Sequence, residues 1–164
     1  MWLFLRQLLS ILILPGTIVV LVPRWLLRNE GASFAWTLSL RSAAGVAVFL
    51  LGFVFFAWSV TLFTRVGRGT LAPWDPTRRL VAAGPYRHVR NPMISGVALM
   101  LSGEALFFGS RSVALWAATF LLANHVYFVL LEEPGLEEKF GEEYRAYKAH
   151  VPRWIPRIRP WTGA

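Results

Sequence analysis

The stretch that decides the fold is "MISGVALMLSGEALFFGSRSVALWAATFLLANHVYFVLL", residues 93–131, because it contains two apolar runs separated by a very short polar break. The runs cover 93–109 and 112–131, and the break is centred on Gly109, Ser110 and Arg111. A connection of about three residues allows only an antiparallel helical hairpin. The start of the first helix and the end of the second therefore emerge at the same end of the molecule.

This hairpin predicts that two polar segments about 40 residues apart in the sequence are neighbours in space. "RNP", residues 90–92, precedes the first helix, and "EEP", residues 132–134, follows the second. A helix C-terminus carries partial negative charge and disfavours carboxylates by a few tenths of a kcal/mol each. The two glutamates therefore need fixed partners, either arginines or the hydroxyl and amino groups of a ligand.

Two further apolar runs, 2–22 and 42–64, precede the hairpin in a chain of 164 residues that is 55% hydrophobic. Helices of about 20 residues cross the ~30 Å hydrocarbon core of a bilayer. The sequence therefore predicts an all-α integral membrane protein with about four transmembrane helices, of which 93–109 is the shortest. Residues 2–22 could also be read as a signal peptide, but no A-x-A-like site follows, so we interpret them as a span.

The chain is expected to form one structural domain, with a two-helix membrane scaffold at 1–64 and the functional region at 65–164. Pro15-Gly16 predicts a kink in the first span. Gly45 and Gly52 predict close helix packing in the second span. Residues 23–41 are expected to be a polar connection on the outer side.

The formal net charge of +8 comes from basic residues that flank the apolar runs, which indicates topology rather than nucleic-acid binding. If the spans alternate, the side that holds both termini carries Arg6, Arg65, Arg68, Arg78, Arg79, Arg87, Arg90, Lys139, Arg145, Lys148, Arg153, Arg157 and Arg159. The other side carries Arg24, Arg28, Arg41 and Arg111. The positive-inside rule then places both termini in the cytoplasm, and we expect a bacterial inner (cell) membrane. The absence of cysteine excludes disulfides and thiol catalysis.

The connection at 65–91 has no sustained period, and its length favours a functional loop or disorder. The apolar anchors Leu71, Trp74, Leu80, Val81 and Tyr86 favour an ordered loop.

After Pro134-Gly135 the pattern predicts an amphipathic interfacial C-terminal helix, which lies on lipid headgroups or covers the polar cluster. Its apolar residues, three or four apart, are Leu136, Phe140, Tyr144, Tyr147 and Val151. Pro152 and Pro156 end it, and Trp154 and Trp161 suit an interfacial belt.

Two segments, "GPYRHVRNPMISG" at 84–96 and "LLEEPGLEEKFGEEYRAYKAHVPRWIP" at 130–156, resemble the membrane-embedded methyltransferases that include isoprenylcysteine carboxyl methyltransferase and the phospholipid N-methyltransferases. The resemblance covers about residues 65–157. In that family, an arginine-histidine-proline motif followed by an aromatic residue and a glycine acts with a glutamate pair to bind S-adenosylmethionine. The matching positions are Arg90, Pro92, Gly96, Glu132 and Glu133, whereas Asn91 replaces the histidine and Met93 the common tyrosine.

The resemblance implies S-adenosylmethionine as cofactor and no metal. The predicted cofactor-binding residues are Tyr86, His88, Arg90, Asn91, Pro92, Gly96, Glu132, Glu133 and Tyr144, and the predicted catalytic residues are Arg90, His88 and Glu133. Arg90 with His88 would hold the carboxylate, and the glutamates the amine or hydroxyls. Tyr86, Phe140 or Tyr144 would line the adenine slot. The Asn91 amide can hydrogen-bond but cannot carry charge.

The predicted reaction is methyl transfer to a membrane-partitioned amphiphilic acceptor at the cytoplasmic face. That acceptor could be an isoprenylcysteine carboxylate, a phospholipid amine, or a small lipophilic thiol, amine or acid. Because the sulfonium leaves as a neutral thioether, alignment in a dry site is the main requirement. A base is needed only for a protonated acceptor, and His88 or a glutamate would supply it.

Two alternatives stay open on the sequence alone. A sterol-type reductase resembles this chain in its C-terminal half, but it would use NADPH. A non-catalytic protein that binds anionic lipid would use the basic loop and the amphipathic tail.

Polar residues inside the spans each have two readings. Glu104 is either functional or a hydrogen-bonded packing residue, and packing is preferred. Asn124 and His125 either face the cofactor or acceptor channel or make helix-to-helix hydrogen bonds. Gly96 and Gly103 favour close packing over room for a ligand.

Overall fold

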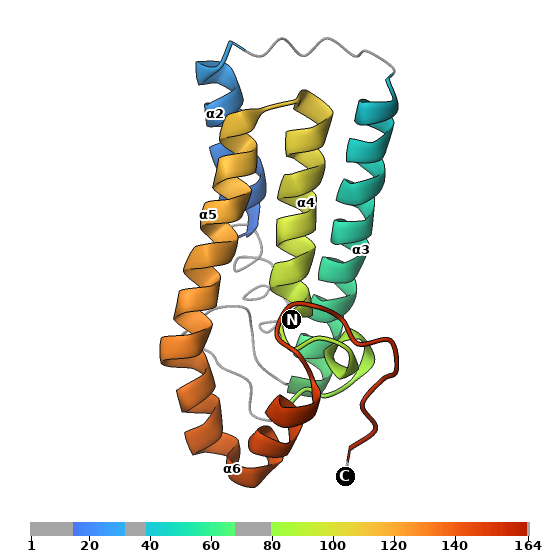
Figure 1. Cartoon of the computed structure of the whole chain (residues 1–164), viewed down its shortest axis with the longest axis vertical. Coiled ribbons are helices and arrows are strands. Elements are labelled where there is room, and N and C mark those ends of the chain that lie inside the picture. Colours follow the sequence, from blue (N-terminus) through green and yellow to red (C-terminus); the bar gives the residue numbers. More distant parts are fainter. Residues whose placement is uncertain (1–14, 32–38, 68–79, 164) are drawn as a thin grey trace.

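The computed structural model describes residues 15–31, 39–67 and 80–163, and every regular element in these ranges is a helix, which confirms the all-α prediction. Figure 1 shows α3 (Leu40–Gly67), α4 (Pro92–Phe108) and α5 (Arg111–Tyr127) running side by side. The short α2 (Val22–Asn29) lies near the α4–α5 turn, and α6 (Glu133–His150) lies at the opposite end. Most of the predicted span 2–22, together with Leu71 and Trp74, lies outside the described residues.

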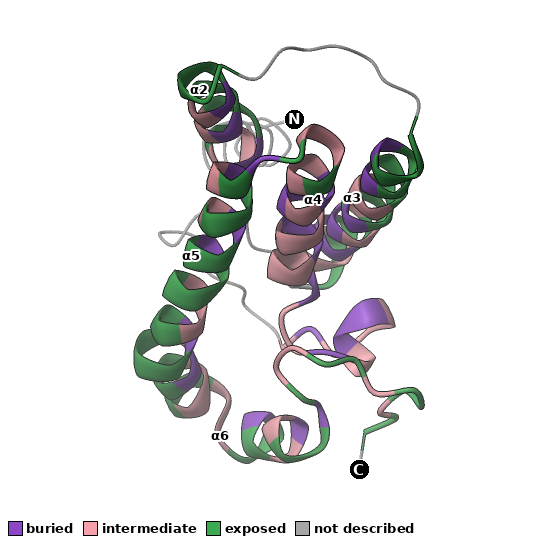
Figure 2. Ribbon diagram, turned by 45° about the horizontal axis from the view of Figure 1, so that its top comes forward, coloured by how far each residue is buried: buried purple, intermediate pink, exposed green. Residues whose placement is uncertain are grey.

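Two helices in the described ranges are long and apolar enough to cross a membrane, Leu40–Val66 and Arg111–His150. The 17 residues of α4 are also apolar but form a shorter helix. The outward faces of α3 and α5 carry large exposed apolar side chains such as Leu50, Phe53 and Leu122, and Figure 2 shows most of α5 as exposed. Such continuous apolar faces are typical of surfaces in contact with lipid.

The α4–α5 turn forms as the sequence predicts. Helix α4 ends at Gly109, whose φ of 64° is a left-handed conformation that glycine adopts without strain. Ser110 caps α5, since its side chain accepts a hydrogen bond from the Val113 N–H at 3.1 Å. The Arg41 guanidinium lies beside Gly109, where it complements the negative C-terminal end of α4. The hairpin is therefore fixed by local capping as well as by packing.

Glu30 binds the start of α5 at the same end of the molecule. Its carboxylate accepts hydrogen bonds from the Ser110 hydroxyl and, at 3.0 Å, from the Ser112 backbone N–H at the start of α5. These bonds hold the pKa of Glu30 below its usual range, and the bond from Ser110 has the largest effect. They connect α2 to the hairpin, a contact that sequence analysis did not anticipate.

Helices α3 and α4 approach closely through opposed glycines. Gly45 lies against Gly103, and Gly52 lies against Gly96. A Cβ atom at any of these positions would come within 2.6–2.8 Å of backbone atoms of the partner helix. The predicted packing role of Gly45 and Gly52 is confirmed, and Gly96 and Gly103 serve the same contact.

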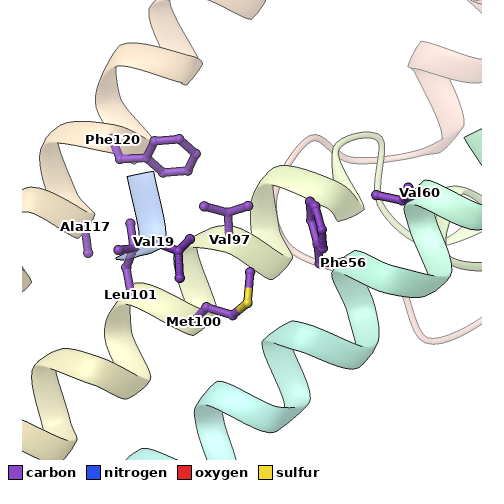
Figure 3. Close-up of a cluster of buried hydrophobic side chains, with 8 residues drawn as sticks. All are labelled: Val19, Phe56, Val60, Val97, Met100, Leu101, Ala117 and Phe120. Carbon is purple, nitrogen blue, oxygen red and sulfur yellow. The ribbon is translucent and has the colours of Figure 1, made fainter. Parts of the chain in front are cut away.

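A cluster of buried apolar side chains joins four helical segments (Figure 3). Its members are Val19, Phe56, Val60, Val97, Met100, Leu101, Ala117 and Phe120. Helix α4 is central to this core because it packs against both α3 and α5.

Each of two π-helical turns lies just before a proline. The turn η1 (Thr17–Leu21) precedes Pro23, and η3 (Phe128–Glu132) precedes Pro134. At the end of each turn the backbone N–H donates to the carbonyl five residues earlier. This wider turn relieves the clash between the following proline ring and the carbonyl four residues before it. Pro15 and Gly16 are themselves helical, so the kink predicted there stays a prediction, and the irregular turn η1 begins only at Thr17. The chain then stays helical over Val22–Asn29, so the predicted polar connection is wrong for that part.

The C-terminal helical region bends at Gly141 instead of forming one straight amphipathic helix. Gly141 has φ 56° and ψ −128°, outside the helical range. The segment after it buries Tyr144, Tyr147 and Val151 against Leu80 and Trp161. These residues therefore pack on protein, and contact of this helix with lipid headgroups stays a prediction.

Candidate active site

Arg90 and Glu133 meet, as the hairpin predicts. Arg90 precedes α4 and Glu133 begins α6, and Arg90 Nη1 donates to Glu133 Oε1 over 2.8 Å. The two side chains are 10% and 6% exposed, so the pair is largely shielded from water. The segments on either side of the hairpin therefore form one polar cluster at the end of the molecule away from the turn.

Three cations surround Glu133. Arg153 Nε donates to the same Oε1 over 2.8 Å, and Lys148 Nζ lies 3.2 Å from Oε2. Burial alone would raise the pKa of Glu133, but the bonds and charges of Arg153, Arg90 and Lys148 outweigh it and hold the pKa below its usual range. Glu133 is therefore an ionised structural centre of the cluster.

Glu132 has different surroundings. It follows the apolar run 112–131, is half-buried, and makes no hydrogen bond or ion pair within the described part of the chain. Burial, with the nearby charge of Glu133, raises the pKa of Glu132 to about 7. The adjacent glutamates thus differ: Glu133 has cationic partners, and the carboxylate of Glu132 is available to a ligand.

The segment before α4 is held in place by α6. It contains the 3₁₀ turn η2 (Gly84–Arg87), and the Tyr147 hydroxyl donates to the Tyr86 carbonyl over 2.7 Å. Tyr86 is buried, and burial raises its pKa, with Tyr147 and Glu132 adding to the shift. Tyr86 therefore stays a neutral phenol, packed beneath the polar cluster.

The C-terminal tail, residues 151–161, runs along this segment, and Figure 1 shows it passing beside the base of α4. The Arg90 N–H donates to the Pro152 carbonyl over 2.9 Å, and the Trp161 N–H donates to the Arg87 carbonyl, also over 2.9 Å. Between them, the Arg157 N–H donates to the His88 carbonyl over 3.0 Å. These bonds fix the tail to the predicted site.

His88 is engaged by this tail. Its Nδ1 lies 2.7 Å from the Arg157 carbonyl, an acceptor, so Nδ1 carries a proton. No hydrogen bond joins His88 to Glu132 or Glu133 in the described residues. The structure therefore brings Arg90 directly to Glu133, and it connects His88 to the cluster only through the tail.

His125 and Asn124 are neighbours on α5 but have different hydrogen-bond partners. Asn124 donates to the Phe120 carbonyl of its own helix, whereas His125 Nδ1 accepts from Trp154 Nε1 over 3.0 Å. The Arg153 guanidinium lies beside that ring, 3.5 Å away. Because an indole N–H only donates, this Nδ1 is unprotonated. His125 thus faces the polar cluster and the tail, and Asn124 does not.

The remaining matched positions lie at the start of α4. Asn91 occupies the N-cap position without a side-chain capping bond, and buried Pro92 is the first helical residue. Gly96 lies against Gly52 and Phe56 of α3, which explains it by packing. Further along α4, Glu104 Oε2 is buried with no hydrogen-bond partner among the described residues, so the expected hydrogen bond is not formed there.

The aromatic residues predicted for the adenine slot differ in burial. Tyr144 is 2% exposed and packs against Tyr147, with ring centroids 6.2 Å apart. Tyr86 is nearly as buried, whereas Phe140 keeps part of its ring exposed beside the same cluster. Phe140 is therefore the residue of the three with free surface.

One polar atom tests whether the cluster fits an amino-acid ligand. Arg90 Nε is buried and has no hydrogen-bond partner in the described part of the chain. A buried guanidinium N–H without a partner is costly, and a carboxylate is the acceptor that would satisfy it best. Together with the available carboxylate of Glu132, it offers complementary partners to a ligand that carries both a carboxylate and an amine. No group of acidic, histidine or cysteine side chains in the described ranges could hold a metal ion.

The role of Lys148 in this cluster was not predicted from the sequence, where it counts among the basic residues that set topology. The bend at Gly141 turns Lys148 back to Glu133 and to Glu137, 2.6 Å away. A glycine within an otherwise polar helical pattern was the available signal. The Trp154–His125 bond had no such signal, because tryptophan near a span favours an interfacial reading.

Comparisons with known proteins agree with the resemblance. An uncharacterized protein of Haemophilus influenzae is 36% identical over 63 residues, which are 38% of this chain and 100% of that protein. A methanethiol S-methyltransferase of Pseudomonas deceptionensis is 30% identical over 82 residues, which are 48% of this chain and 29% of that enzyme. No solved structure matches. The model of the phospholipid methyltransferase family matches residues 40–143, more than half of the chain and both polar segments, so this chain belongs to that family.

Proposed function

We propose that the chain transfers a methyl group from S-adenosylmethionine to a lipophilic acceptor at the cytoplasmic membrane face. The observation that carries the proposal is that Arg90, held by Glu133, keeps a buried Nε–H beside the glutamate pair. Within the described residues neither this Nε–H nor the half-buried Glu132 carboxylate has a hydrogen-bond partner. The family match supports methyl transfer.

In this proposal Arg90 Nε–H donates to the carboxylate of the methyl donor, because a buried guanidinium N–H without an acceptor is costly. Ionised Glu132 accepts from its amine or ribose hydroxyls. Half-buried Phe140, which packs beside Tyr144 and has the Lys139 ammonium 5.5 Å from its ring centroid, would line the adenine site. Glu133 holds Arg90 in place and so acts through it.

S-adenosylmethionine supplies, when bound, an electrophilic methyl group on a sulfonium. The acceptor would supply the lone pair for the new bond to carbon, and the sulfur would leave with the carbon–sulfur electron pair as a neutral thioether, so no residue of the chain would have to protonate the leaving group. The protein therefore needs to align two reactants and exclude water. A protonated amine acceptor would also have to lose a proton, and Glu132, whose pKa is raised to about 7, would take it.

The acceptor is expected to be lipophilic because the site adjoins exposed apolar surface of the α5–η3 region, including Leu130 and Leu131 directly before the glutamates. A phospholipid amine, an isoprenylcysteine carboxylate and a small thiol all fit that approach. The named relative, a methanethiol S-methyltransferase, supports inclusion of small thiols.

Four spans with both termini in the cytoplasm complete the proposal. The predicted span 2–22 would precede α3, and α4 would cross with α5 despite its length. The candidate site lies at the end of the molecule with most described basic residues, namely Arg65, Arg87, Arg90, Lys139, Arg145, Lys148, Arg153, Arg157 and Arg159. The positive-inside rule makes that end cytoplasmic.

Binding of S-adenosylhomocysteine and of NADPH to purified protein tests the proposal. We expect S-adenosylhomocysteine to bind and NADPH not to bind. Arg90→Ala and Glu132→Ala should each abolish binding, whereas Glu138→Ala, at an exposed acidic position on α6, should not. NADPH binding in place of S-adenosylhomocysteine would establish the reductase alternative and refute methyl transfer.

The acceptor can be identified with labelled S-adenosylmethionine, a membrane lipid extract and a set of small thiols. Label should enter a lipid-soluble product with wild-type protein and not with the Arg90→Ala, Glu132→Ala double variant. Label that persists with the double variant would point to a contaminant or another site.

A further inference from the structure

Arg153 reaches the polar cluster from the C-terminal tail. Its Nε and Arg90 Nη1 both lie 2.8 Å from Glu133 Oε1, so the two arginines share one oxygen. The other oxygen, Oε2, faces Lys148 Nζ at 3.2 Å. Each oxygen of Glu133 therefore has a cationic partner other than Arg90.

This sharing restricts how Arg90 can pair. An arginine and a carboxylate interact most strongly when two parallel N–H groups meet two oxygens. Arg90 makes one such bond, and its Nε has no hydrogen-bond partner among the described residues. Arg153 and Lys148 occupy the oxygens that a two-point Arg90–Glu133 pair would use.

We infer that Arg153 is a positioning residue that keeps the Nε–H of Arg90 available for the carboxylate of the methyl donor. The inference rests on the proposed function, in which that carboxylate meets Arg90. Without Arg153, the Arg90 guanidinium can turn both donors to Glu133 and withdraw Nε–H from the ligand.

The chain holds Arg153 by its two neighbours. The Pro152 carbonyl accepts from the Arg90 N–H over 2.9 Å, and Trp154 Nε1 donates to His125 Nδ1 over 3.0 Å. The Trp154 ring also packs against Phe128, with centroids 5.8 Å apart. The backbone at Arg153 is thus fixed between the segment before α4 and the end of α5, which aims its guanidinium at Glu133.

Two ligands separate a positioning role from a structural one. S-adenosylhomocysteine carries the carboxylate, and 5′-methylthioadenosine is a similar nucleoside thioether without the amino-acid part. In full-length Arg153→Gln we expect affinity for S-adenosylhomocysteine to fall roughly tenfold or more, as for loss of one charge-assisted hydrogen bond. Affinity for 5′-methylthioadenosine should change less than about twofold, since that ligand makes no such bond.

Three variants control this measurement. Arg153→Lys keeps a cation near Glu133 and should restore part of the lost affinity. Trp154→Phe keeps the ring but removes the N–H, so it should give a smaller loss in the same direction. Arg159→Gln changes an exposed cation of the same tail and should leave both affinities unchanged.

Equal losses for both ligands would overturn the inference, because they would mean that Arg153 only maintains the fold. No loss for either ligand would overturn it too. If Arg153→Gln does not fold, Arg153→Lys and Trp154→Phe carry the same comparison. Wild-type protein that binds neither ligand would instead refute the proposed function, a result that is distinct from any selective effect of a variant.

Discussion

Adjacent residues can have opposite electrostatic roles when only one of them faces a cationic cluster. Glu133 faces Arg90, Arg153 and Lys148, and its pKa is lowered against the effect of burial. Glu132 is partly buried and has no such partner in the part of the chain that the structure describes, and burial raises its pKa to about 7. A sequence motif of two glutamates therefore conceals a division between a residue that builds the site and a residue that can bind a ligand.

The raised pKa of Glu132 predicts a pH dependence of ligand binding. Because the ionised form binds the ligand amine, affinity for S-adenosylhomocysteine should increase about tenfold from pH 6 to pH 8, as a group of pKa about 7 loses its proton. Titration calorimetry across this range measures the effect. In Glu132→Gln the profile should be flat and the affinity low, and an unchanged slope in that variant would assign the dependence to another group.

The raised pKa of Glu132 has the opposite effect on the free energy of unfolding. The folded protein holds the Glu132 proton more tightly than the unfolded chain does, so this stabilising contribution is complete below about pH 4.5 and is lost as pH rises through about 7. Stability and ligand affinity are therefore expected to change in opposite directions with pH, as far as this residue determines them.

Removal of the Glu133 charge should destabilise the fold. Glu133→Gln leaves three cations around a neutral amide, and loss of one partner from a buried ion pair costs about 3 kcal/mol or more. Unfolding in detergent, followed by circular dichroism, measures the loss. Glu138→Gln is the matched control at an exposed position, and equal stability of the two variants would contradict the structural role.

At the scale of elements, the contact between α3 and α4 depends on the absence of side chains at four positions. A Cβ on Gly52 would lie 2.6 Å from the Gly96 carbonyl oxygen and 2.7 Å from the Met100 nitrogen, and backbone atoms cannot yield as a flexible side chain can. Gly52→Ala should therefore separate the helices and destabilise the protein by about 1–3 kcal/mol.

Gly135→Ala is the matched control for this prediction. Gly135 is helical, and a Cβ there meets nothing within 4 Å, so alanine should be neutral or stabilising by up to about 1 kcal/mol. Thermal unfolding of both variants in the same detergent separates the two cases. A loss in Gly135→Ala equal to that in Gly52→Ala would show that glycine removal, rather than helix contact, is responsible.

For the whole molecule, the parts that sequence analysis predicted correctly follow from strong local constraints. The three-residue turn at Gly109 requires a hairpin, and the hairpin alone brings Arg90 to Glu133. The bend at Gly141 was not predicted because a single glycine is a weak helix-breaking signal. The tail contact of Trp154 was not predicted because it depends on where that bend directs the chain, and no local pattern encodes this direction.

The orientation of the whole molecule in the membrane gives a last prediction. The native chain has no cysteine, so a single introduced cysteine reports on one position without background. Arg111→Cys lies at the hairpin turn and Glu138→Cys on α6 at the opposite end, and both positions are exposed. In membrane vesicles of known orientation, an impermeant maleimide should label Arg111→Cys only from outside and Glu138→Cys only from the cytoplasmic side, because basic residues concentrate at the second end. Labelling of both from one side would mean that the α4–α5 hairpin does not cross the bilayer, and the polar cluster would then need a different route for a lipophilic acceptor.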